Sequence, residues 1–298
     1  MQKIYIFKLF MKKLAICVPT FNRAQLLDRL LNSIPASEDI IVSICDDGSK
    51  DNTLEIVQKH QSRISINYVY QQNRGRSGAL RKSILNAEAE FVMVVDSDDY
   101  IEKEGIEIIL KSLKKNTSVS FFVFPITIFK NSLSRIISLN GIPQTNYVAL
   151  RSDFGVKGDL QEVISHKLLL NVMYEDPKDI RRIPTSYLWF KASEQVDCLP
   201  VECLPVKVKE YSKDGMSANL LPLKVNYPKY LVSMYKIALR SKKFKSLFYR
   251  FKYTILFYRY SFHNKTFGLL KLRDFPFYLI GFICGLFDLL MLSIFYKK

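Results

Sequence analysis

The chain has 298 residues, of which 48% are hydrophobic and 24% are charged. This composition excludes a disordered chain, and the length suits one large domain or one domain with an appendage. The net charge of +16 is unevenly spread, because residues 224–298 carry 15 Lys and Arg against two acidic residues. No acidic residue lies from Gly215 to Arg273. Such a basic segment seeks the phosphates of nucleic acid or of anionic lipid.

The five cysteines are odd in number, and no two have the spacing of metal ligands. We therefore expect reduced cysteines, with Cys17 and Cys45 buried in apolar strands. The three histidines are isolated and are predicted to be structural or surface residues. Residues 1–10 do not read as a signal peptide, because their apolar part is short and is broken by Lys8. We expect either a natural start at Met11 or a dispensable extension before it.

The first hundred residues alternate between short apolar runs and amphipathic segments. Strands are predicted at residues 14–19, 40–45, 66–70 and 91–95, and helices at 24–34, after Asn52, and at 77–87. Asn52 and Glu55 have the spacing of a capping box. This order predicts an α/β fold with a doubly wound, mainly parallel sheet flanked by helices.

The middle of the chain mixes helix and strand signals. Strands are predicted at residues 118–129 and 206–211, and helices at 159–170 and 187–195. We expect one domain over residues 11–223. Residues 224–298 would form a basic and aromatic helical tail with a hydrophobic segment at 275–296.

Three predicted parallel strands end in polar motifs: PTFNR at residues 19–23, DDGS at 46–49 and DSDD at 96–99. Open α/β sheets bind ligands beyond the carboxyl ends of their strands, so a site is expected there. In extended chain Asp96 and Asp98 would face the same way and address one ligand. Two hard oxygen donors suit Mg²⁺ or Mn²⁺, which would relieve carboxylate repulsion and neutralise a diphosphate. The alternative is a solvated acidic turn.

PTFNR, DDGSKDNT, QQNRGRSGALRKSILNA and VVDSDDY, in this order, resemble the inverting family 2 glycosyltransferases of the GT-A fold, of the bacterial surface-polysaccharide type. The resemblance covers about residues 13–220. Dinucleotide-binding and P-loop folds fit worse, because their glycine motifs are absent. The resemblance implies sugar transfer from a nucleotide sugar, more often UDP-linked. It also implies Mn²⁺ or Mg²⁺ as cofactor. We expect a lipid-linked saccharide as acceptor, because it explains the basic, apolar C-terminal tail as a soluble acceptor would not.

The resemblance also assigns residues. The nucleotide-sugar site would be formed by Pro19, Thr20, Arg23, Asp46, Asp47, Asn73, Gly75, Arg81, Asp96 and Ser97. Within this set, Asp47 beside Asp46 would contact the base, and Asp96 the ribose or sugar. Asp98 is the implied metal ligand. A later stretch, VKEYSKDGMSAN, resembles a loop that closes over the diphosphate, with Tyr211, Asp214, Gly215 and Ser217; an ordinary glycine turn is the alternative.

An inverting transferase needs a general base, and here the sequence departs from the family. Where the family has an acidic residue before a helix, this chain has Thr185 and Ser186. Asp159 and Glu162 resemble a Gly-Asp…Glu element of the same subgroup, and we predict that they are catalytic. A helix N-cap and a surface acid are the alternative reading. Other candidates are Glu175, Asp176 and Asp179. The missing acid also leaves open a non-catalytic nucleotide-sugar-binding module or membrane scaffold.

The stretch from Phe275 to Tyr296 has 22 residues with one charge, Asp288. As a helix it is long enough to cross a bilayer, whereas a carboxylate at mid-membrane is costly. A membrane-inserted or re-entrant helix and a buried, partner-facing helix both stay open. The basic and aromatic segment 241–262 is typical of an interfacial helix on anionic lipid, which fits better than nucleic acid. We therefore expect localisation at the cytoplasmic face of the inner membrane, peripheral or anchored by the C-terminal segment.

Overall fold

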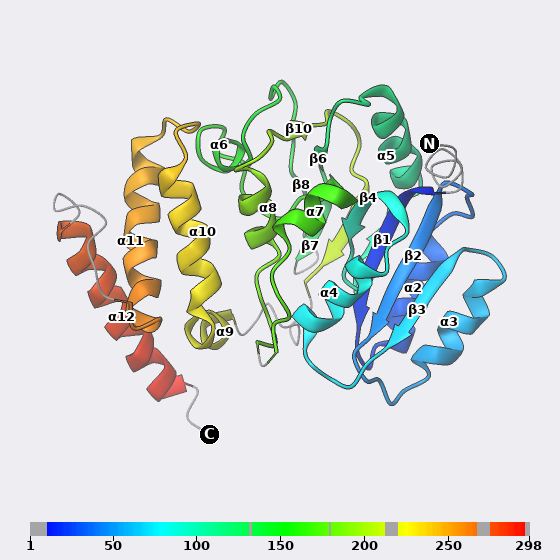
Figure 1. Ribbon diagram of the computed structural model, residues 1–298, viewed down its shortest axis with the longest axis horizontal. Coiled ribbons are helices and arrows are strands. Elements are labelled where there is room, and N and C mark those ends of the chain that lie inside the picture. Colours follow the sequence, from blue (N-terminus) through cyan, green and yellow to red (C-terminus); the bar gives the residue numbers. More distant parts are fainter. Residues whose placement is uncertain (1–10, 131–132, 179, 212–219, 267–274, 296–298) are drawn as a thin grey trace, which may run out of the picture. The chain divides into compact units, whose positions relative to one another are not determined.

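The computed structural model describes residues 11–130, 133–178, 180–211, 220–266 and 275–295 (Figure 1). The described residues divide into two compact units. The first unit is drawn from Met1–Thr145, Lys157–Arg181 and Asp197–Tyr211, and the second from Asn146–Val156, Arg182–Val196 and Ser212–Lys298. Asn146–Val156 and Arg182–Val196, which precede the expected domain boundary at residue 223, therefore belong to the same unit as the tail.

The first unit contains a seven-stranded mixed sheet in the order β10-β6-β9-β4-β1-β2-β3. Its strands are β1 (Lys12–Thr20), β2 (Ile40–Asp46), β3 (Ile66–Tyr70), β4 (Ala89–Val94), β6 (Phe121–Phe124), β9 (Gln161–Ser165) and β10 (Leu199–Pro200). β1 runs parallel to β2 and β4, and β2 runs parallel to β3. β9 is antiparallel to both of its neighbours, β4 and β6. The first four predicted strands and the mainly parallel, doubly wound sheet are confirmed.

Helices cover both faces of this sheet because its strands are apolar on both sides. They are α2 (Ala24–Ser33), α3 (Thr53–Gln61), α4 (Arg76–Leu85), α5 (Gly105–Lys115) and α7 (His166–Val172). Leu14, Ile16 and Val18 of β1 share one core with buried side chains of α2, α3 and α5. Cys17, which points to the other face, lies 3.7 Å through its Sγ from the Ser83 carbonyl of α4. Cys17 and Cys45 are buried, as predicted.

Three local predictions are wrong. Residues 159–170 begin as strand β9 and turn into helix α7 only at His166. An apolar run this short fits the residue spacing of a helix or of a strand. It forms a strand here because it pairs with β4 on one side and with β6 on the other. The strand predicted at 118–129 stops at Phe124, and β7 (Thr127–Lys130) joins a different sheet after Pro125, which lacks an N–H. Asn52 begins α3, but its side chain makes no capping hydrogen bond.

A smaller four-stranded sheet has the order β5-β11-β7-β8. Its remaining strands are β5 (Tyr100–Ile101), β8 (Leu133–Ile136) and β11 (Lys207–Glu210), the last as predicted. β11 pairs antiparallel with β5, which directly follows the DSDD motif, and parallel with β7. This pairing brings the lysines of β11 beside the acidic motif.

The second unit is helical in its described residues. Its helices are α6 (Tyr147–Ser152), α8 (Ser186–Ala192), α9 (Leu220–Asn226), α10 (Pro228–Arg240), α11 (Leu247–His263) and α12 (Phe275–Phe295). Figure 1 shows α10, α11 and α12 side by side, with α11 in the middle. Helices near the predicted 187–195 and 275–296 are therefore present. α12 is long and apolar enough to cross a membrane by length and composition.

Candidate active site

The three polar motifs meet at one edge of the large sheet. β1, β2 and β4 are parallel and in register, with Thr20 opposite Asp46 and Cys17 opposite Val94. Just beyond the strands, the Asp47 N–H donates to the Thr20 carbonyl at 2.8 Å. The sequence prediction that PTFNR, DDGS and DSDD converge at the carboxyl ends of the strands is confirmed.

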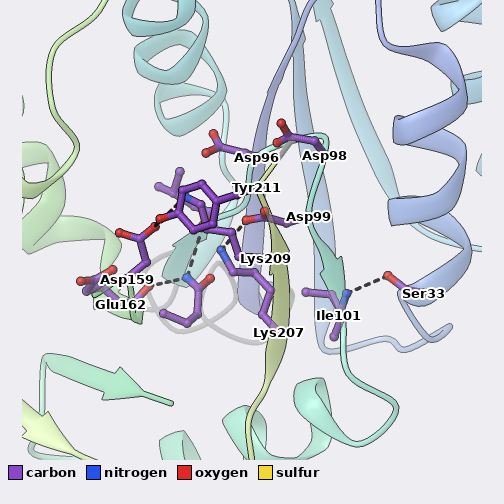
Figure 2. A network of polar contacts seen from close by, with 12 residues as sticks. Ser33, Asp96, Asp98, Asp99, Ile101, Asp159, Glu162, Lys207, Lys209 and Tyr211 are labelled. Carbon is purple, nitrogen blue, oxygen red and sulfur yellow. Dashed lines mark hydrogen bonds and ion pairs between the residues drawn. The ribbon is translucent and has the colours of Figure 1, made fainter. Parts of the chain in front are cut away.

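The DSDD motif forms a turn and not an extended segment. The Asp99 N–H donates to the Asp96 carbonyl at 3.0 Å, so the extended geometry assumed for Asp96 and Asp98 is wrong. Their carboxylates nevertheless lie on the same flank of the polar network in Figure 2. Each meets an arginine: Arg76 Nη2 is 2.6 Å from Asp96 Oδ1, and Arg23 Nη1 is 2.7 Å from Asp98 Oδ2.

Asp96 and Asp99 differ in how their charge is balanced. Burial by itself raises the pKa of the Asp96 carboxyl, but Arg76, with Lys209 and Lys207, holds that pKa well below its usual range. Asp99 is 1% exposed, and its Oδ2 lies 2.7 Å from Lys207 Nζ, whose side chain is 7% exposed. Burial raises the pKa of Asp99 despite Lys207. Among the described residues, Asp99 Oδ1 has no hydrogen-bond partner.

The DDGS carboxylates are both buried and are engaged within the protein. Asp46 accepts from the Ser49 N–H and from the Tyr68 hydroxyl, each at 2.8 Å. Asp47 accepts from three groups of the loop after β3: Gln71 Nε2 at 2.7 Å, and the Arg74 and Gly75 N–H groups at 2.8 Å each. Asp47 thus fixes the loop that leads into α4.

That loop requires a glycine at its end. Gly75 has φ +86°, and a Cβ there would lie 2.5 Å from the Arg181 Cα, so no other residue fits without a shift. Arg181 also donates to the Asn73 side-chain oxygen. Arg81, further along α4, donates through Nε to the Tyr174 carbonyl at 3.2 Å.

The remaining predicted nucleotide-site residues are buried or lie within the sheet. Pro19 pairs with Cys45 in β2, and Ser97 is buried in the DSDD turn. Thr20 is buried as well, and its hydroxyl has no hydrogen-bond partner among the described residues. A buried hydroxyl without a partner at a strand end suits contact with a ligand.

Asp159 and Glu162 lie close together on another side of the network (Figure 2). Asp159 precedes β9, and its Oδ2 accepts from the Tyr211 hydroxyl at 2.6 Å and pairs with Lys209 Nζ at 2.9 Å. Burial raises the pKa of Asp159, but Lys209 and Tyr211 bring it below its ordinary value, so the carboxylate is ionised at neutral pH. Glu162 is buried within β9, opposite Val123.

The other candidates for the base are scattered. Asp176 pairs with Arg74 at 2.7 Å, and Glu175 is exposed. Thr185 and Ser186 begin α8 in the second unit. Asp179, Asp214, Gly215 and Ser217 lie outside the described residues.

Residues 15–160 match the family model described as glycosyl transferase family 2. These residues form a family 2 glycosyltransferase domain. Poly(ribitol-phosphate) beta-N-acetylglucosaminyltransferase TarS of Staphylococcus aureus strain Mu50 is 38% identical over 103 residues, which are 33% of this chain and 18% of TarS. Chondroitin synthase of Escherichia coli is 29% identical over 109 residues, which are 36% of this chain and 16% of that protein. The chain thus spans less than a fifth of the length of these two relatives.

Solved structures share the fold. The crystal structure of S. aureus TarS 1–349 matches with a TM-score of 0.63 and 20% identity, covering 93% of this chain and 79% of that chain. Its complex with UDP-GlcNAc matches with a TM-score of 0.62 and 18% identity, covering 90% and 79%. The mannosyltransferase PcManGT of Pyrobaculum calidifontis, in complex with GDP-Man and Mn²⁺, matches with a TM-score of 0.54 and 14% identity, covering 100% and 95%. The predicted GT-A fold is confirmed.

Sequence reasoning missed four charged residues of the polar network, namely Arg76, Asp99, Lys207 and Lys209. Arg76 lies inside the quoted QQNRGRSG motif and could have been noted as a cation near the acidic motifs. The alternating pattern of VKVKEY places Lys207 and Lys209 on the same side of a strand. That pattern indicated a shared face, but it did not indicate the carboxylates that this face meets.

We expect Lys207→Met to lower the free energy of unfolding by about 3–5 kcal/mol, because it leaves the buried Asp99 carboxylate without its cation. Urea titration followed by circular dichroism measures the loss. The double variant Lys207→Met/Asp99→Asn should recover much of it. The control is Lys209→Met, which should cost less because its partner Asp159 is 44% exposed. An unchanged urea midpoint for Lys207→Met would contradict a stabilising role for the pair.

Proposed function

We propose that this chain is an inverting glycosyltransferase that moves a sugar from a nucleotide-sugar donor to a saccharide acceptor. The observation that carries the proposal is the convergence of three strand ends on Asp96 and Asp98, within a domain of family 2. A UDP-linked donor is supported by the similarity to TarS, which was crystallised with UDP-GlcNAc. The non-catalytic alternative is less favoured, because the DSDD and DDGS motifs are intact.

The donor would lie over the carboxyl ends of β1, β2 and β4. Asp47 holds the loop at residues 71–75 in place, so that Asn73 and Gly75 form one wall of the nucleotide pocket. The hydroxyl of Thr20 would supply a hydrogen bond to the donor. Asp47, with Asp46 beside it, would contact the nucleotide's base. Arg23, Arg81, Asp96 and Ser97 complete the proposed donor site.

We propose Asp98 as the protein ligand of Mn²⁺ or Mg²⁺. Among the described residues, no group of three or more His, Cys, Asp or Glu is arranged to hold a metal ion. We expect an ion held by one or two carboxylates and by diphosphate oxygens, as is usual for Mg²⁺. Such an ion, when bound, neutralises charge on the departing diphosphate. Asp98 is 29% exposed and paired with Arg23, so this arginine has to yield its position.

The acceptor needs a base at its attacking hydroxyl. We propose that Asp159 or Glu162 takes the hydroxyl proton while the oxygen bonds to the anomeric carbon of the donor sugar. The bond from that carbon to the diphosphate breaks in the same step, and the nucleoside diphosphate leaves with the electron pair. Lys209 and Tyr211 support this role for Asp159, because they keep its carboxylate ionised and oriented.

The acceptor we propose is a lipid-linked saccharide, reached from an anionic membrane surface at the cytoplasmic face of the inner membrane. Residues 224–298 carry +13 of the +16 charge, and α12 is apolar apart from Asp288. This combination supports a membrane better than nucleic acid, since nucleic acid gives no reason for the apolar helix.

Asp98→Asn should lower turnover by at least about a hundredfold, since it removes a charged ligand and leaves the core packing intact. Transfer and donor hydrolysis are measured with a panel of nucleotide sugars, with and without Mn²⁺. Glu107→Gln, which alters an exposed carboxylate on α5, is the control. Normal turnover by Asp98→Asn, or full activity in excess EDTA, would rule out the metal-dependent mechanism.

For the base, we expect Asp159→Asn or Glu162→Gln to reduce turnover much more than donor affinity. This pattern marks a group used in the transition state and not in ground-state binding. Steady-state kinetics are combined with calorimetric binding of UDP; Asp176→Asn tests the other candidate, and Glu107→Gln, an exposed carboxylate on α5, is the control. If both variants keep wild-type turnover, the assignment of the base is wrong. If the wild type shows neither transfer nor hydrolysis with any donor, the result favours the non-catalytic alternative.

Membrane association is best tested by substitutions that remove charge. A truncation at residue 223 is less suitable, because segments 146–156 and 182–196 belong to the same compact unit as the removed helices. Lys242→Gln/Lys245→Gln removes two exposed lysines and should weaken binding to anionic vesicles by about 2 kcal/mol, roughly thirtyfold, at low salt. Vesicle flotation measures this. Lys111→Gln/Lys115→Gln, on α5, is the matched control and should bind as wild type. Equal flotation of both double variants would contradict the basic tail as the anchor.

A further inference from the structure

α12 buries small and polar residues and exposes apolar ones, which is the reverse of a surface helix in a water-soluble protein. Among the α12 residues whose burial is described, 275–293, the buried ones are Gly281, Gly285 and Asp288, which are spaced four and three apart and form one stripe. The other side, here called the outer face, carries exposed Leu279, Ile280, Ile283, Leu286, Phe287 and Leu290. A surface helix in water buries its apolar stripe and exposes polar residues. Small and polar residues inside with apolar residues outside is the pattern of helices that border hydrocarbon.

The buried stripe is committed to α11. A Cβ on Gly281 would lie 2.6 Å from the Tyr258 Cβ, and one on Gly285 would overlap the Phe262 ring, so both glycines permit close approach. Asp288 accepts from Arg259 Nε at 2.8 Å and lies 2.9 Å from His263 Nε2. Its side chain is 2% exposed. The single charge of the hydrophobic segment is therefore turned inward and paired, which removes the objection that the sequence raised against membrane contact.

The same packing argues against a membrane-crossing helix. The two helices run in the same direction, because Phe251 stacks on Phe277 near both starts, at 5.0 Å between ring centroids, whereas Asp288 meets the end of α11. The other side of α11 packs against α10, and α10 exposes Lys236 near its middle. A crossing α12 would have to draw the packed helices and this cation into the hydrocarbon, which is costly, or give up its contacts with α11.

We propose that α12 lies along the membrane with its outer face in the hydrocarbon of one leaflet of an anionic bilayer, without crossing it. The inference rests on the proposed membrane association and adds the mode of insertion. Charge complementarity supports a lipid occupant, because no acidic residue lies between Gly215 and Arg273. At the start of α11, exposed Leu247, Phe248 and Phe251 stand next to Lys252, as expected for a segment at the headgroup level.

Measuring how deep labels on α12 lie in the bilayer distinguishes a helix along the membrane from one that crosses it. Full-length protein carrying Cys203→Ser and Cys284→Ser receives one nitroxide at Leu279→Cys, Ile283→Cys or Leu290→Cys, and is bound to vesicles of phosphatidylglycerol and phosphatidylethanolamine. Oxygen and nickel-chelate accessibilities give the depth of each label. We expect all three labels at a similar depth, about 5–10 Å below the headgroup boundary. Lys111→Cys, on α5, is the control and should stay in water.

A crossing helix predicts a different profile. Positions 279 and 290 are about 16 Å apart along a helix axis, so their depths would differ by most of that distance, and this result would overturn the proposal. If the protein dimerises and the labels are shielded without vesicles, a second copy covers the outer face and the proposal fails. If wild type does not float with vesicles, the membrane part of the proposed function fails as well, while the transfer assays still test the chemistry. As a further check, Ile283→Glu/Phe287→Glu should reduce the binding that survives high salt.

Discussion

The edge of the sheet depends on giving every buried carboxylate a partner from elsewhere in the chain. Without a partner such a group costs several kcal/mol; the two carboxylates of DDGS accept hydrogen bonds from neutral donors, whereas those of DSDD meet cations. The pairs are Asp98 with Arg23, Asp96 with Arg76, Asp99 with Lys207, and Asp159 with Lys209. The first two cations come from loops and helix starts at the sheet edge, and the last two from β11. The small sheet thus serves to bring two lysines to the acidic motif.

This balance has a consequence for the proposed donor. A nucleoside diphosphate brings negative charge and its metal ion brings positive charge, so the two together disturb the local balance little. The ion would take the place of Arg23 at Asp98, and the freed guanidinium would then face the phosphates, for which its planar donor set is suited. The site is already polarised before the ligand arrives, and such preorganisation keeps reorganisation during the reaction small.

The first four strands and their helices could be predicted, because apolar runs of β1, β2, β3 and β4 alternate with clear helical periods. The positions of PTFNR, DDGS and DSDD followed from parallel topology. Long-range pairing could not be predicted. Lys207 and Asp99 are 108 residues apart, and a K-x-K pattern does not indicate which carboxylates its lysines meet. Nor does a short apolar run at residues 159–170 reveal that it inserts as a strand between β4 and β6. For α12 the single charge could be read from the sequence, but the direction in which Asp288 points could not.

Exposure separates the ion pairs by the role each can have. In the Asp99–Lys207 pair both side chains are almost fully buried, and Asp288 with His263 is equally closed, so exchange with a solute would require the local fold to open. In the Asp98–Arg23 pair each side chain keeps more than a quarter of its surface in solvent, so either partner can be replaced without disturbing the core. Asp96 has similar exposure but is held by the well-buried Arg76. Closed pairs therefore fix the turn and the helix pair, whereas the more open Asp98–Arg23 pair is the one at which the proposed metal ion could replace a cation of the protein.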